Sequence, residues 1–122
     1  MLKVTVLGLG LLSGSLFAQD NAQVISGSMT KNYHVAISSN DSLHVGTNDL
    51  KVDIVQKAHK LSGMDVNLTL YTPDNKELHY NHVNSSEYFK TDLSTKGEYR
   101  YNIKFSSGSG AVSHNSMGSF SL

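Results

Sequence analysis

Residues 64–71, with the sequence MDVNLTLY, alternate between apolar and polar side chains more regularly than any other stretch of the chain. Met64, Val66, Leu68 and Leu70 all fall on one side of this alternation. Because successive side chains of a β-strand point to opposite faces, the spacing predicts a strand with one buried face. This strand is the starting point for predicting the rest of the fold.

The same period of two recurs on both sides of this strand. It marks six further runs, at residues 33–38, 48–55, 77–83, 88–93, 99–105 and 111–122. Turn residues separate the runs, and no stretch shows the apolar period of about 3.6 that is typical of an amphipathic helix. The pattern predicts an all-β fold, a single immunoglobulin-like antiparallel β-sandwich of about seven strands over residues 31–122.

The amino-acid composition excludes several classes of function and of site. The chain has 122 residues, 10 Lys and Arg against 10 Asp and Glu, and no cysteine. A balanced charge argues against nucleic-acid binding, which needs a basic face to offset phosphate charge. The absence of cysteine excludes disulfides, zinc knuckles and thiolate nucleophiles. Imidazole and thioether remain as ligands for a soft or borderline metal ion.

The N-terminus has the pattern of a secretory signal peptide at residues 1–18. Lys3 precedes a short apolar run, and small and apolar residues lead to Ala18. The run is shorter than the roughly 20 residues of a membrane-spanning helix. We expect cleavage after Ala18, a flexible polar lead-in at residues 19–30, no membrane span in the mature chain, and export to the periplasm or the external medium.

The approach to a late strand carries a structural signature. Gly97 stands two residues before Tyr99 at the start of the run at residues 99–105. This is the layout of a tyrosine corner, in which the Tyr hydroxyl bonds back to upstream backbone. The alternative is that Tyr99 is simply a core aromatic, and either interpretation keeps the sandwich.

The first candidate metal site combines the two ends of the mature chain. Met29 and His34 lie at or before the first strand, and His114 and Met117 lie in the last. The first and last strands of such sandwiches can run side by side. His114 and Met117 face opposite ways on a regular strand, so the cluster requires a bulge among the surrounding Gly and Ser residues. The alternative is four unrelated surface side chains.

The second candidate is the pair His79 and His82, which also face opposite ways on a straight strand. A bend at Asn81 would let them share a metal ion, with Glu77 or Glu87 as an oxygen ligand. The alternative is a solvent-exposed pair. Met64 belongs to the apolar face of its strand and is expected to fill the core.

Catalytic motifs are absent from the sequence. It contains no nucleophile elbow, no His-Glu-x-x-His and no phosphate-binding glycine loop outside the expected signal peptide. Acidic residues are scattered rather than paired on one face. We therefore do not expect an enzyme.

Three motifs, taken in order, resemble a known family. LHVGTNDLKV at residues 43–52 resembles an L-x-V-G-x-N-x-L-x-V opening, LSGMDVNL at 61–68 a small-x-V-x-L strand, and GEYRYNI at 97–103 a G-x-Y strand. These are marks of the YtkA-like/FixH-like group of small exported β-sandwich domains. A signal peptide before one domain with His and Met residues is similar to the copper resistance determinant proteins of the CrdA type. A Met-Pro or Met-rich segment, common in the group after the central strand, is missing here.

The resemblance implies copper binding or copper tolerance in the cell envelope, beside a metal-efflux system. We therefore expect an exported protein that buffers or delivers copper through His and Met ligands. The alternative is an interaction module without a metal, which docks on an envelope efflux or assembly partner by an exposed sheet edge.

Overall fold

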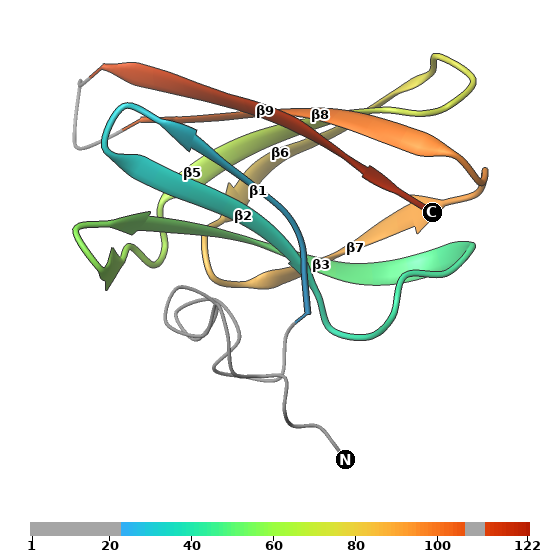
Figure 1. Cartoon of the computed structure of the whole chain (residues 1–122), viewed down its shortest axis with the longest axis horizontal. Helices are drawn as coiled ribbons and strands as arrows, with labels where there is room; N and C mark the ends of the chain where they lie inside the picture. The colour runs from blue at the N-terminus through green and yellow to red at the C-terminus, as the bar shows by residue number, and fades with distance from the viewer. Residues whose placement is uncertain (1–22, 107–111) are drawn as a thin grey trace.

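The computed structural model describes residues 23–106 and 112–122, which form two antiparallel β-sheets packed face to face (Figure 1). The strands are β1 (Gln23–Thr30), β2 (Tyr33–Ser39), β3 (Gly46–Gln56), β4 (His59–Lys60), β5 (Asp65–Tyr71), β6 (Glu77–Asn84), β7 (Tyr88–Leu93), β8 (Glu98–Ser106) and β9 (Ser113–Ser121). Sheet A has the order β1-β2-β3-β4, with β7 also paired to β3, and sheet B has the order β6-β5-β8-β9. The predicted all-β sandwich is confirmed.

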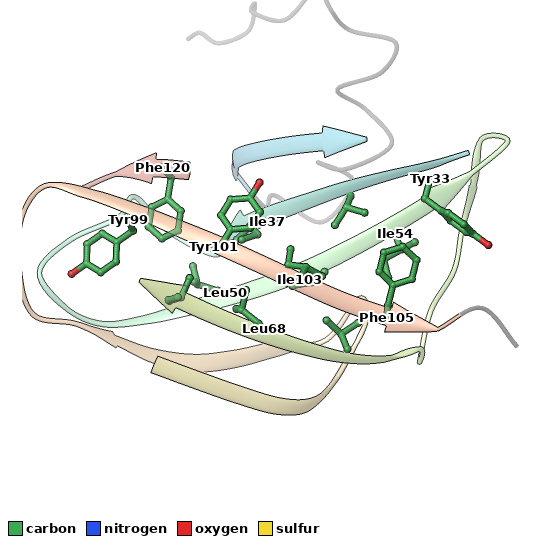
Figure 2. Close-up of a cluster of buried hydrophobic side chains, with 14 of the residues drawn as sticks. Tyr33, Ile37, Leu50, Ile54, Leu68, Tyr99, Tyr101, Ile103, Phe105 and Phe120 are labelled. Atoms are coloured by element: carbon green, nitrogen blue, oxygen red, sulfur yellow. The ribbon is translucent and has the colours of Figure 1, made fainter. Parts of the chain in front are cut away.

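The core lies between the sheets and follows the predicted alternation. In β5, the residues Val66, Leu68 and Leu70 are fully buried. They meet buried side chains from β2, β3, β7, β8 and β9 (Figure 2). Met64 is partly buried and packs against this core, as expected.

The described residues contain nine strands rather than the expected seven. One addition is β1, which occupies residues 23–30 of the segment expected to be a flexible lead-in, so that expectation is wrong for these residues. An edge strand needs few apolar side chains, and β1 is held by main-chain pairing with β2 on one side, with one register shift between Val24 and Ser26. The other is the two-residue β4, which lies in the expected connection after β3.

Irregular pairing is absent from β9 and occurs in β1 and β6. The register of β9 against β8 runs without a break from Ser113 to Ser121, so the bulge predicted among the Gly and Ser residues around His114 and Met117 does not occur within β9. Gly110, also part of that prediction, lies outside the described residues. Register shifts occur instead in β1, between Val24 and Ser26, and between β5 and β6. The second shift leaves Asn81 and His82 of β6 against Asn67 of β5, which is the place of the bend on which the shared His79–His82 site depends.

A tyrosine corner joins the loop before β8 to the core. The buried Tyr99 hydroxyl donates to the carbonyl of Thr95 at 2.6 Å and accepts from the Thr95 amide at 3.2 Å. Gly97 has φ +132°, and a Cβ there would lie 3.0 Å from Pro73. Both the backbone conformation and this contact therefore require glycine.

Within residues 23–106 and 112–122, no helix has the length and hydropathy needed to cross a bilayer. The expected signal peptide at residues 1–18 lies outside the described residues.

Candidate functional site

The β1–β2 hairpin places the predicted ligands Met29 and His34 side by side. Thr30 pairs with Tyr33, and Met29 pairs with His34 directly across the hairpin. A two-residue loop makes the closing pair hydrogen-bonded, and the next pair is therefore of the non-hydrogen-bonded kind, with Cα atoms about 4.5 Å apart. Side chains approach each other most closely in such pairs. The register thus brings a thioether and an imidazole to one place on the sheet.

Both side chains point to the outer face of sheet A. Met29 is 62% exposed, and His34 is exposed as well. They line a surface hollow of about 270 Å³ together with Gly27 and Ala36. A Cβ added at Gly27 would meet nothing nearer than the Val35 carbonyl at 3.8 Å, so small neighbours leave this space open.

His114 lies apart from this pair, on the inner face of sheet B. It is 8% exposed and packs between the rings of Tyr33 and Phe105, with centroid distances of 4.8 and 5.2 Å. The regular register of β9 explains its position, because His114 lies an even number of residues from the buried Phe120. His114 is a core residue of the sandwich.

Met117 lies on the other face of β9 and is 70% exposed. The four residues of the first predicted cluster therefore divide into the pair Met29 and His34, the buried His114, and the outward Met117. Among residues 23–106 and 112–122, no three His, Asp or Glu side chains are placed to hold a metal ion together.

His79 and His82 both lie exposed on β6, each beside its own carboxylate. His79 Nε2 is 3.1 Å from Glu77 Oε1, and His82 Nδ1 is 3.1 Å from Asp65 Oδ1. His82 has φ +58°, and its amide donates to Asn67 Oδ1 at 2.9 Å, which holds the irregular backbone in place. The two imidazoles thus lie in separate hydrogen-bonded pairs, each with its own carboxylate.

Of the two carboxylates that the sequence analysis named, Glu77 lies beside His79, whereas Glu87 accepts from the Asn84 side chain at 3.5 Å. Asp65, the partner of His82, was missed. Asp65 could have been found only from the register between β5 and β6, since it pairs with Asn84.

The turn between β5 and β6 contains a carboxylate with a lowered pKa, Asp74. The hydroxyl of Thr72 donates to Asp74, which lowers the pKa of that carboxyl.

A row of hydroxyl groups, also missed from the sequence, joins β1 of sheet A to β9 and β8 of sheet B. Ser28 Oγ contacts Ser116 Oγ, and Ser26 Oγ lies 2.7 Å from Tyr101 Oη. We call these four residues the hydroxyl seam. It lies where the two edge strands β1 and β9 run along the same side of the sandwich (Figure 1). The only sign in the sequence is the spacing of Ser26 and Ser28, which is that of one strand face.

Compared with family models, curated proteins and solved structures, the chain gives no match.

Proposed function

We propose that this protein binds copper in the cell envelope and buffers or delivers it through His and Met side chains, with Met29 and His34 as the principal ligands. The supporting observation is that this thioether and imidazole are directly opposed, exposed, and beside an open hollow. Thioether sulfur favours Cu(I), and imidazole binds copper in proteins. The motifs that resemble the YtkA-like/FixH-like group, and its copper-resistance members, point to the same metal.

A site with only two protein ligands suits a metal ion that is bound transiently and transferred to another molecule. Cu(I) held by Met29 and His34 has coordination positions left for a ligand from another molecule. The ion can then pass to an acceptor, such as a metal-efflux component in the envelope, without displacing core side chains. Location in the envelope rests on the expected signal peptide at residues 1–18, and the missing cysteines suit a compartment in which thiols oxidise.

Anaerobic titration of the purified protein with Cu(I), against a coloured competing chelator, tests the proposal. Met29→Leu with His34→Asn removes both donors and keeps the side-chain volumes close. Loss of outer-shell partners alone lowers metal affinity roughly 10- to 100-fold, so loss of both ligands should weaken binding by more than about tenfold. The matched control is Met117→Leu with His82→Asn, which also removes one exposed Met and one exposed His. This control should bind copper like the natural chain.

Two results would overturn the proposal. One is equal loss of affinity in the test and control variants, which would mean that exposed His and Met bind without a defined site. The other is a natural chain that binds no more tightly than a scrambled peptide with the same His and Met content.

The alternative function is docking on an envelope partner through a sheet edge. The specific observation in its favour is that β1 and β9 are both edge strands. Replacing the exposed candidates Met29, His34, His79, His82 and Met117 together separates the two functions, and His114 is kept because it is part of the core. If copper tolerance and capture of a partner both survive this variant, docking is the better explanation.

A further inference from the structure

The β1–β2 hairpin differs from the rest of the sandwich in how it is held. No residue of β1 belongs to the buried core, which begins at Tyr33. Ile25 is partly buried against it, and the register with β2 is broken between Val24 and Ser26. Across the sandwich, side-chain hydroxyl contacts of the seam join β1 to sheet B. The contacts that attach β1 are therefore mostly polar.

The turn before β2 has an unfavourable backbone. Lys31 and Asn32 form the whole connection, and Lys31 has φ +53°. A side chain with a Cβ pays a steric cost in this left-handed region, and glycine does not. Extending these two residues would remove the cost. Short hinge loops under strain are the usual route by which a strand is exchanged between copies of a protein.

We propose that the chain forms a dimer by exchanging β1, so that β1 of one copy pairs with β2 of a second copy. Lys31 and Asn32 are the hinge. Every contact of β1 is remade in the exchanged form, including the pairing with β2 and the hydroxyl seam. The balance between monomer and dimer is then set by the strain released at Lys31 and by the entropy lost on association.

The exchange also bears on the copper site, and this part rests on the proposed function. Met29 belongs to β1 and His34 to β2, so each site in the exchanged dimer combines Met29 of one copy with His34 of the other. Such a dimer holds two composite sites of unchanged local geometry.

The first test uses the absence of cysteine from the chain. Met29→Cys and His34→Cys proteins, carrying different isotopic labels, are mixed, unfolded, refolded together and oxidised. The two positions are opposed in a non-hydrogen-bonded pair, whose Cα separation of about 4.5 Å is within disulfide range. Mass spectrometry then counts mixed disulfides against like pairs. Exchange predicts that the mixed disulfide greatly exceeds both like pairs.

The matched control uses Lys104→Cys with Asn115→Cys. These positions are directly opposed and exposed on β8 and β9, but β9 is held by core residues. They should give mixed disulfides only at the random level. A Met29→Cys and His34→Cys mixture at this same level would overturn the proposal.

Hinge variants add a second measurement that needs no disulfide. Lys31→Gly relieves the backbone in the closed hairpin, so light scattering should show the monomer favoured about fivefold or more over the natural chain. Deleting Asn32 leaves too short a loop to close and should give a dimer throughout. A Lys31→Gly protein with an unchanged or larger dimer fraction would contradict the role of the hinge.

Copper separates exchange from the proposed function. Met29→Ala and His34→Ala chains each lack one ligand, but refolding them together gives mixed dimers in which one of the two sites has both ligands and the other has neither. Recovery of Cu(I) binding supports both proposals. If the mixed disulfide forms and copper binding does not recover, β1 exchange stands and the Met29–His34 site is wrong.

Discussion

The strands β1 and β9 form the two edges on one side of the sandwich, and both are rich in Ser and Gly, yet they are held by different forces. β9 pairs with β8 over its whole length and buries Phe120 and His114. β1 contributes no core residue, and its register with β2 is broken. Two edge strands of similar composition can therefore differ in attachment: β9 is held by buried core residues, whereas β1 is held mainly by polar contacts. The proposed copper ligand Met29 lies on β1, the more weakly attached strand.

The largest expected difference between the two strands comes from removing an apolar side chain from each. Phe120 is 5% exposed and stacks on Tyr99 at a centroid distance of 5.4 Å. Phe120→Ala should lower the free energy of unfolding by about 3–5 kcal/mol because it leaves a cavity among aromatic rings. Ile25→Ala, in partly buried surroundings, should lower it by about 1 kcal/mol. Denaturant unfolding measures both, and equal losses would contradict the contrast between the strands.

The fold could be predicted where apolar residues alternate with polar ones. β5 shows this most clearly, since Val66, Leu68 and Leu70 are buried as their spacing requires. β1 could not be predicted in this way, because its inward positions include Ser26 and Ser28 rather than apolar residues. Those hydroxyls are satisfied by partners far away in the sequence, and no local pattern records that contact.

The candidate site was predictable in part. Met29 and His34 could be placed near the first strand, but their direct opposition depends on a two-residue turn whose Lys31 adopts an unfavourable φ. The buried position of His114 was indicated weakly by the sequence. Stepping back two residues at a time from Phe120 reaches Gly118, Ser116 and His114, yet Gly and Ser at these inward positions hide the alternation.

A smaller difference should come from adding one methyl group to a glycine in each strand. A Cβ at Gly118 would lie 2.4 Å from Tyr101 Oη and 2.7 Å from Tyr101 Cζ. Because Tyr101 is buried, its ring has little room to move, and Gly118→Ala should destabilise the fold by about 2 kcal/mol. Gly27→Ala makes only an ordinary contact, 3.8 Å from the Val35 carbonyl, and should be neutral or stabilise by up to about 1 kcal/mol.

Denaturant unfolding also measures the change in free energy of unfolding for the two glycine substitutions. The two are compared with the same dependence of that free energy on denaturant concentration. If Gly27→Ala were the more damaging of the two, β1 would be packed as tightly as β9. The weak attachment of β1, on which strand exchange depends, would then be wrong.

The smallest expected effect concerns the hydroxyl seam, where the two strands meet. Ser116 is 2% exposed, whereas Ser28 is partly buried. Ser28→Ala leaves the buried Ser116 hydroxyl without its partner, and should lower the free energy of unfolding by about 1–2 kcal/mol. Ser116→Ala leaves the Ser28 hydroxyl within reach of water and should lower it by about 0.5–1 kcal/mol.

Replacing both serines should cost less than the sum of the two single changes, because no hydroxyl is then left buried and unpaired. A double-mutant cycle by denaturant unfolding measures this coupling. Additive losses would mean that the contact between Ser28 and Ser116 contributes no pairwise stabilisation. β1 would then be attached by its pairing with β2, by the contact between Ser26 and Tyr101, and by the partly buried Ile25. Strand exchange predicts that both single changes leave the monomer–dimer balance unchanged, because the contact is remade identically after exchange.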